Sequence, residues 1–176
     1  ESIAKNLGKL GYDIAIQYNK SEKKAKEIEK SSEMTGVKFK AYKFNFEKND
    51  NFNSFFCNII NDFGKIDLLI NNASTFEYDS LISSNQSIFN RHINVNLKGP
   101  FFLSQNFVKH LKGKEGLIIN IIDQRVNNIT PYFTSYTLSK TALVTLTKSL
   151  ALSLSPKIRV NGISPGPTLM SKNQNK

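Results

Sequence analysis

The amino-acid sequence predicts a doubly wound α/β fold, in which a parallel β-sheet lies between two layers of helices. Apolar runs of strand length alternate with helical patterns over all 176 residues, which is typical of βαβ units. Several of these runs end in polar or turn-forming residues, at the edge where ligands bind in open parallel sheets. We find no internal repeat, low-complexity segment or domain boundary, so we expect one domain over residues 1–176.

The expected helices are defined by apolar faces and by the residues that end them. In the first helix Ile3, Leu7 and Leu10 share one face, and Gly11 follows as a stop. Ser21 is placed to cap the second helix, and Pro100 is a candidate kink site in the fourth. Helices are expected over 2–10, 21–34, 49–63, 86–111 and 133–154.

The expected strands are short and apolar. Residues 117–123 form an almost continuous apolar run, and the run I-D-L-L-I-N-N at 66–72 is that of a buried strand. Strands are expected over 12–18, 37–46, 66–72, 117–123 and 158–163. Five strands in strict alternation with five helices predict a Rossmann-type, three-layer αβα domain.

The chain opens with a helix, whereas a dinucleotide-binding fold opens with a central strand and a glycine-rich turn. In the strand order 3-2-1-4-5-6, the absent first strand would separate the second strand from the fourth. We therefore expect two sheet edges with unpaired backbone groups, in a domain that is incomplete at both ends. Residues 1–176 alone are expected to be neither a stable monomer nor an active enzyme, unless an N-terminal extension or another chain fills the slot.

Composition and charge exclude several classes of function. No apolar run reaches the length of about 18 residues that a transmembrane helix needs, so we expect no membrane partner. The single cysteine, Cys57, excludes an internal disulfide and a cysteine-built metal site, and a cytoplasmic location and no metal are expected. The net charge of +10 comes mostly from scattered lysines, with arginine only at 91, 125 and 159, so no nucleic-acid partner is expected.

Tyr136 and Lys140 are four residues apart in T-S-Y-T-L-S-K and therefore share one helix face. A lysine ammonium near a phenol stabilises the phenolate and lowers the pKa of the tyrosine. Such a pair alone also fits an exposed amphipathic helix. Its context favours a site, because the strands at 66–72 and 117–123 end in polar residues and the strand at 158–163 ends in a turn. Their carboxyl ends meet at one edge of a parallel sheet.

Four motifs, in order, resemble those of the short-chain dehydrogenase/reductase family. N-N-A-S resembles the family's N-N-A-G, and Y-T-L-S-K resembles its Y-x-x-x-K. N-V-N-L-K-G-P resembles the segment with the family's active-site asparagine, which falls on Asn96, and R-V-N-G-I-S-P-G-P-T resembles the C-terminal P-G segment. The matches cover essentially the whole chain and imply an NAD(P)-dependent oxidoreductase.

The resemblance implies a role for each matching residue. Tyr136 would donate a proton, Lys140 would hold the nicotinamide ribose and lower the pKa of the tyrosine, and Asn96 would support a water that relays protons. The remaining cofactor contacts would be Asn72 and Ala73 at the adenosine side, with Ser74 beside them, and Pro165, Gly166 and Thr168 at the nicotinamide and phosphates.

Asp123 stands thirteen residues before Tyr136, where the family carries its catalytic serine. A carboxyl group suits pairing with a nitrogen-rich ring better than with a ketone oxygen. The pteridine reductases resemble this sequence in having that aspartate. They also resemble it at N-A-S-T-F, which would offer Ser74 to a pterin and stack Phe76 on it.

Cofactor choice is indicated after the strand at 12–18. An NAD-specific site places an acidic residue there for the ribose hydroxyls, whereas this chain has Asn19, Lys20 and Ser21. Lysine and serine suit a 2′-phosphate, so the cofactor is expected to be NADP(H). Ser21 would serve as helix cap and as phosphate ligand. Asn45 stands where the family usually has an aspartate that contacts adenine.

These observations favour an NADPH-dependent reductase of a dihydropterin or related heterocycle, with a small-molecule substrate and a homo-oligomeric state. One alternative is a carbonyl reductase of the 3-oxoacyl type, although a carboxylate does not suit an enolate-like oxyanion. The other is a non-catalytic fragment or nucleotide-binding pseudoenzyme, because the glycine turn that binds pyrophosphate is missing.

Overall fold

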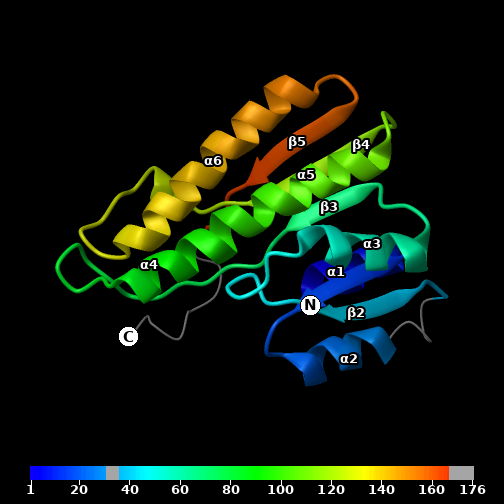
Figure 1. Cartoon of the computed structure of the whole chain (residues 1–176), viewed down its shortest axis with the longest axis horizontal. Helices are drawn as coiled ribbons and strands as arrows, with labels where there is room; N and C mark the ends of the chain where they lie inside the picture. Colours follow the sequence, from blue (N-terminus) through cyan, green and yellow to red (C-terminus); the bar gives the residue numbers. More distant parts are fainter. Residues whose placement is uncertain (31–35, 167–176) are drawn as a thin grey trace. The chain divides into compact units, whose positions relative to one another are not determined.

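The computed structural model describes residues 1–30 and 36–166, and all structural statements below concern these ranges. It contains five strands, which pair in parallel within each of two sheets, and the helices that connect them (Figure 1). The elements are α1 Ser2–Lys9, β1 Ile14–Tyr18, α2 Glu22–Lys30, β2 Phe39–Lys43, α3 Phe52–Phe63, β3 Leu68–Asn71, α4 Gln86–Ile93, η2 Asn94–Lys98, α5 Gly99–Leu111, β4 Gly116–Ile121, η3 Gln124–Val126, α6 Thr134–Leu154 and β5 Ile158–Ile163. This element order confirms the predicted α/β class of doubly wound parallel fold.

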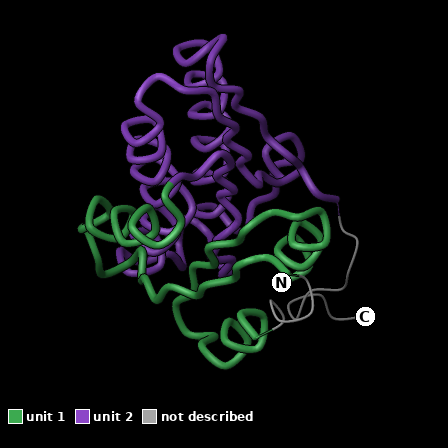
Figure 2. Tube along the Cα trace, turned by 90° about the vertical axis from the view of Figure 1, so that its right-hand side faces the viewer, with its two compact units in different colours: residues 1–64 green, residues 65–176 purple. Residues whose placement is uncertain are grey.

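The chain divides into two compact units, residues 1–64 and 65–176 (Figure 2), which are described one at a time. In the first unit β1 and β2 pair in parallel, with Ile14 opposite Phe39. Phe39 and Tyr42 lie on opposite faces of β2, because side chains alternate along a strand. Helix α1 packs on Phe39 through Gly8, where a Cβ atom would overlap the ring.

The core of the first unit is a group of phenylalanines. Phe44 lies after β2, with its ring centroid 4.3 Å from that of Phe55 and 5.3 Å from that of Phe52. Phe44, Phe46, Phe52, Phe55 and Phe56 are all buried. Full burial of one such ring contributes roughly 1.5–3 kcal/mol, so these rings fix α3 on its face of the sheet. Asn51 caps α3 by accepting from the Ser54 N–H.

In the second unit β3, β4 and β5 form one parallel sheet, with Leu68 opposite Leu117 and Gly116 opposite Ile158. Helix α6 packs on β5, and α5 packs on β3 and β4. Ile118 and Leu143 are almost fully buried between the sheet and α6. Gly116 lets the end of α5 approach β4, since a Cβ atom there would lie 2.6 Å from Leu111 Cδ1.

The pairing agrees with the strand order expected from the sequence. Strand β1 pairs with β2, strands β3, β4 and β5 pair in that order, and the described strands show no ladder between β1 and β3. The expected single domain stays a prediction. No helix in the described ranges is both long enough and apolar enough to cross a bilayer.

Two helix predictions need comment. The helix expected over 21–34 begins at Glu22, and its last positions fall outside the described residues. The helix expected over 86–111 is interrupted by a π-helical turn at Asn94–Lys98, one turn earlier than a kink at Pro100 would suggest. Pro100 has no N–H for the carbonyl of Asn96, and Gly99 donates instead to the Asn94 carbonyl five residues back.

Candidate active site

Tyr136 and Asp123 form the centre of the candidate site. Tyr136 lies in the first turn of α6 and is 5% exposed, and its hydroxyl donates to Asp123 Oδ2 at 2.6 Å. The other carboxylate oxygen accepts the Arg125 N–H at 2.8 Å, which caps η3. The carboxyl end of β4 thus holds Asp123 beside the phenol, as the sequence predicted.

The pKa of Tyr136 is raised well above its ordinary value. Burial of the phenol is the largest cause, and the hydrogen bond to Asp123 and the charge of that carboxylate add to it. The Arg125 charge and the Ser74 hydroxyl act in the opposite direction. The net shift is therefore opposite to the lowering expected from Lys140, because burial and Asp123 dominate. Tyr136 is held as a neutral phenol, the form that can donate a proton.

Lys140 lies one helical turn after Tyr136 and is 3% exposed. Its Nζ donates to the Ile121 carbonyl at 2.8 Å and lies 5.9 Å from the centre of the Tyr136 ring. Burial lowers the pKa of Lys140 to about 8, although the Asp123 charge raises it. An ammonium has three donors, so two remain available for a ligand such as a pair of ribose hydroxyls.

Asn96 is fully buried in the π-helical turn η2 and joins three segments. Its Oδ1 accepts from Ser74 Oγ at 3.1 Å and from the Thr75 N–H at 2.9 Å. Its Nδ2 donates to the Thr75 carbonyl at 3.1 Å and to Ser139 Oγ at 3.0 Å. The structure therefore brings Asn96 to the loop after β3 and to α6, while its expected relay role stays a prediction.

Phe76 lies in an aromatic cluster beside Tyr136. Its ring stacks on that of Phe133, with centroids 4.4 Å apart and an interplanar angle of 8°. It also meets the Tyr136 ring edge-on at 4.7 Å. The Arg125 guanidinium lies 4.7 Å from the Phe133 centroid and 5.5 Å from that of Phe76. These rings form a surface of the kind that a planar heterocycle can stack on.

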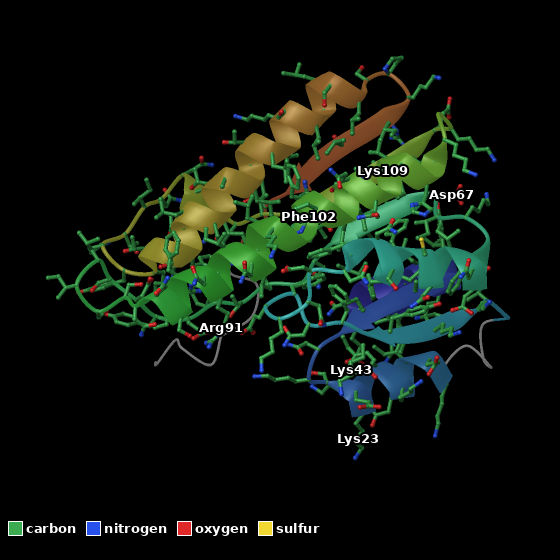
Figure 3. The ribbon with its side chains drawn as sticks, viewed as in Figure 1. Lys23, Lys43, Asp67, Arg91, Phe102 and Lys109 are labelled. Carbon is green, nitrogen blue, oxygen red and sulfur yellow. The ribbon has the colours of Figure 1, made fainter. Side chains whose placement is uncertain are left out.

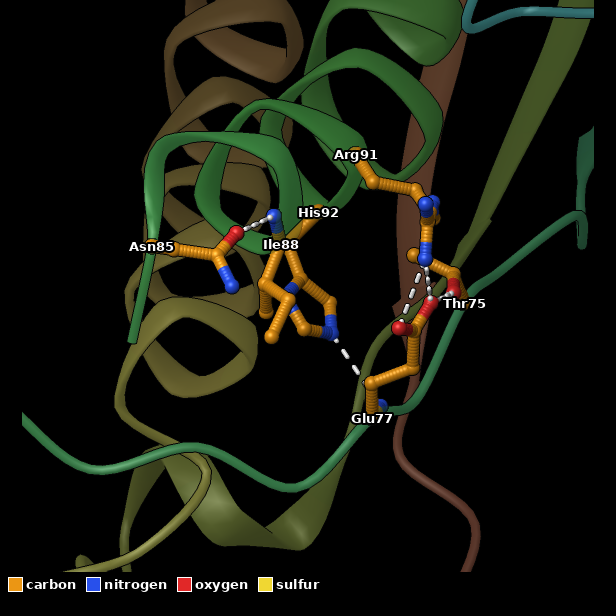
Figure 4. A network of polar contacts seen from close by, with 6 residues as sticks. All are labelled: Thr75, Glu77, Asn85, Ile88, Arg91 and His92. Carbon is orange, nitrogen blue, oxygen red and sulfur yellow. Dashed lines mark hydrogen bonds and ion pairs between the residues drawn. The ribbon is translucent and has the colours of Figure 1, made fainter. Parts of the chain in front are cut away.

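A polar network fixes the loop after β3 to α4 (Figure 4). Arg91 donates to both carboxylate oxygens of Glu77 at 2.8 and 2.7 Å, and the Thr75 hydroxyl donates to the same carboxylate. The Glu77 N–H donates to Nε2 of the fully buried His92. Burial lowers the pKa of His92, so its ring is neutral, with the proton on Nδ1.

Asp79 caps the helix that carries Tyr136. It is fully buried, and its carboxylate accepts from the Ser135 N–H, the Ser135 hydroxyl and the Ser84 hydroxyl. Its own carbonyl accepts the Phe133 N–H at 2.6 Å. Burial alone would raise the pKa of Asp79, but the hydrogen bonds from Ser135 and Ser84 outweigh burial and lower it.

The expected cofactor residues fall in both units, in each case after strands. Asn19, Lys20 and Ser21 follow β1, and Asn45 follows β2, where its Oδ1 accepts the Glu47 N–H. The exposed Lys20 has no ion-pair partner within the described part of the chain. In the second unit Asn72, Ala73 and Ser74 follow β3, and Pro165 and Gly166 follow β5. Thr168 lies outside the described residues.

Several residues that shape the site were not identified from the sequence. They are Asp79, His92, Arg125, Phe133, Ser135 and Ser139. The buried pair Asn71 and Asn120, joined at 2.8 Å, was missed as well. Asparagine within two apolar strands was the available signal for that pair. Among residues 1–30 and 36–166, no group of three or more His, Cys, Asp and Glu side chains could hold a metal.

The chain matches the family model described as short chain dehydrogenase over residues 1–176. It belongs to the short-chain dehydrogenase/reductase family. A solved structure of FolM alternative dihydrofolate reductase 1 from Brucella suis, in complex with NADP, is similar with a TM-score of 0.90 and 37% identity. That similarity covers 96% of this chain and 71% of the other.

Two curated relatives have other activities. The 2-dehydro-3-deoxy-D-gluconate 5-dehydrogenase of Formosa agariphila is 32% identical, over 94% of this chain and 63% of its own length. The 3-oxoacyl-[acyl-carrier-protein] reductase FabG of Staphylococcus epidermidis is 30% identical, over 94% of this chain and 68% of its own length. The chain thus spans about two thirds of these relatives.

Proposed function

We propose that this protein is an NADPH-dependent reductase of a dihydropterin or a related conjugated heterocycle. The observation that carries the proposal is the bond from the Tyr136 hydroxyl to Asp123 Oδ2 at 2.6 Å, with Phe76 edge-on to the same tyrosine. A carboxylate next to a proton-donating phenol suits a nitrogen-rich ring. The similar Brucella suis protein is described as an alternative dihydrofolate reductase, which supports the same substrate class.

The residues present fit a nicotinamide cofactor. The buried Lys140 ammonium has two donors left for ribose hydroxyls, and the exposed Lys20 after β1 offers a cation to a 2′-phosphate. The solved Brucella suis structure contains NADP. Reduced nicotinamide, when bound, supplies a hydride.

The chain's own residues then manage the protons. Each Asp123 oxygen accepts one hydrogen bond from the protein and has a lone pair left for a ring N–H of the substrate. The hydride adds to the carbon of a ring C=N bond, and the unprotonated nitrogen of that bond takes the proton that Tyr136 passes on through the Asp123 carboxyl group. The Lys140 ammonium then stabilises the phenolate left on Tyr136.

A 3-oxoacyl reductase is the second candidate, supported by the similarity to the Staphylococcus epidermidis enzyme. A Tyr–Lys pair can protonate a carbonyl oxygen as well as a ring nitrogen. Asp123 argues against this candidate, because its carboxylate would repel the oxyanion that develops on the substrate.

A substrate comparison tests the proposal on the intact natural protein. NADPH oxidation is followed with dihydrobiopterin, dihydrofolate and an acetoacetyl thioester. We expect kcat/KM for at least one pterin substrate to exceed that for the thioester by about tenfold or more. A thioester that is reduced faster than both pterins would reject the proposal in favour of the carbonyl reductase.

A further inference from the structure

Arg125 is a cation on the aromatic surface of the candidate site, and no motif assigns it a role. It follows Asp123 by two residues in η3, and its backbone N–H is bound by the Asp123 carboxylate. Its guanidinium lies over the rings of Phe133 and Phe76, which stack on each other. Phe76 in turn meets Tyr136 edge-on, so Arg125 belongs to the same cluster as the proton donor.

In the described residues the Arg125 guanidinium forms no ion pair with the acidic residues near the site, which bind other groups. Asp123 receives the Tyr136 hydroxyl, Glu77 is occupied by both of its contacts with Arg91, and Asp79 is enclosed by serine donors. Over the described ranges, the Arg125 side chain has neither an ion pair nor a hydrogen bond.

The contact with the rings leaves the N–H donors of the Arg125 guanidinium available for an anion. A cation–π contact occupies none of the five N–H donors of the guanidinium. That planar fork matches a carboxylate with two parallel hydrogen bonds. The rings also hold the group in place, so less entropy is lost when it binds an anion.

We propose that Arg125 determines specificity by binding a carboxylate carried on the substrate, beside the ring that stacks at Phe76. This inference rests on the proposed function and narrows it to conjugated heterocycles with an acidic side chain, such as the glutamate of dihydrofolate. A substrate anion is favoured over a cofactor phosphate because Arg125 contacts Phe76 and Phe133, neither of which is an expected cofactor residue.

The test uses Arg125→Gln in the intact natural protein, with dihydrofolate and dihydrobiopterin as substrates that differ in the acidic side chain. One charged hydrogen-bonding pair corresponds to roughly 10- to 100-fold in binding. We expect the ratio of kcat/KM for dihydrofolate to that for dihydrobiopterin to fall by about this factor, mainly through KM for dihydrofolate. Added salt should raise that KM in the wild type and have a smaller effect in Arg125→Gln.

The matched control is Arg159→Gln, which removes an exposed arginine from β5, where Arg159 pairs in register with Leu117 at the start of β4. Its selectivity ratio should equal that of the wild type. An unchanged ratio in Arg125→Gln would overturn the inference, and so would a weakened affinity for NADPH with equal losses on both substrates. If the wild type reduces neither compound, the proposed function itself fails and the inference fails with it.

Discussion

Replacing Asp79 by alanine should destabilise the protein because it removes the buried cap of α6. Three donors lose their acceptor, namely the Ser135 N–H, the Ser135 hydroxyl and the Ser84 hydroxyl. Hydrogen bonds to a charged group contribute roughly 1.5–3 kcal/mol, and a buried donor without a partner costs about 1–3 kcal/mol. Since water can enter the space left by the carboxylate and these effects overlap, we expect the free energy of unfolding to fall by about 3–5 kcal/mol.

Asp79→Asn tests the contribution of the negative charge alone, because asparagine has nearly the same shape as aspartate. The amide keeps one acceptor oxygen but loses the negative charge at the helix N-terminus, so we expect a loss of about 1–2 kcal/mol. The assay is urea unfolding of the intact protein by circular dichroism, with Asp67→Asn as the control. Asp67 is 62% exposed and pairs with Lys65 at 3.1 Å, so its loss should change stability by less than about 0.5 kcal/mol.

The stability that Asp79 contributes should depend on pH with a definite sign. Its folded-state pKa lies below the ordinary value of 3.8, so the contribution is complete above that value and is lost as pH falls through the folded-state pKa. Asp79→Asn should therefore be less stable than the wild type at neutral pH and approach it in acid. A loss below about 1 kcal/mol for Asp79→Ala at neutral pH would refute the capping argument.

Three further predictions concern the chemistry, and a fourth concerns stability. Asp123→Ser should lower kcat/KM for a dihydropterin by about 10- to 1,000-fold while the Kd for NADPH stays within about threefold, and equal losses in both would contradict a carboxylate that faces the substrate. Lys20→Ala should weaken the binding of NADPH relative to that of NADH by about tenfold in calorimetric titrations. An unchanged ratio of the two affinities would refute the proposed contact between Lys20 and the 2′-phosphate. Because the pKa of Lys140 is lowered to about 8, NADPH affinity should fall as pH rises through that value, whereas Lys140→Arg should keep its affinity. The same shift should make the protein more stable as pH rises from about 8 to 10.5, because the unfolded lysine binds the proton more tightly there.

The element order and the Tyr136–Asp123 pair could be predicted because both depend on local patterns. Apolar runs define β3 and β4, which pair in parallel, so the polar residues that follow them lie at one sheet edge. The helix after β4 brings Tyr136 to Asp123 there. The sequence also indicates that the lysines are scattered along the chain rather than gathered in one cluster. Lys23, Lys43 and Lys109 are all exposed and are distributed over three elements (Figure 3).

Asp79 could not be found because its role depends on a partner 56 residues away. In the sequence F-E-Y-D-S-L an aspartate has the pattern of an ordinary turn residue. The π-helical turn at Asn94–Lys98 was missed for a similar reason, since a proline predicts a kink but not the side to which the backbone widens. The raised pKa of Tyr136 reflects the depth of burial, which spacing alone does not give.

Helix α6 uses two neighbouring rows of side chains for two purposes. Ser135 and Ser139 are one turn apart and bind Asp79 and Asn96, so the loop after β3 is fixed to the helix on both sides of Tyr136. Tyr136 and Lys140, also one turn apart, contact Asp123 and the Ile121 carbonyl at the end of β4. The contacts of Ser135 and Ser139 therefore set the position of Tyr136 and Lys140 against the sheet. Placement of this kind matters because proton transfer requires donor and acceptor within hydrogen-bonding distance before the reaction begins. We expect an uncapped α6 to keep all of these side chains and still lose the 2.6 Å contact on which the proposed proton transfer depends.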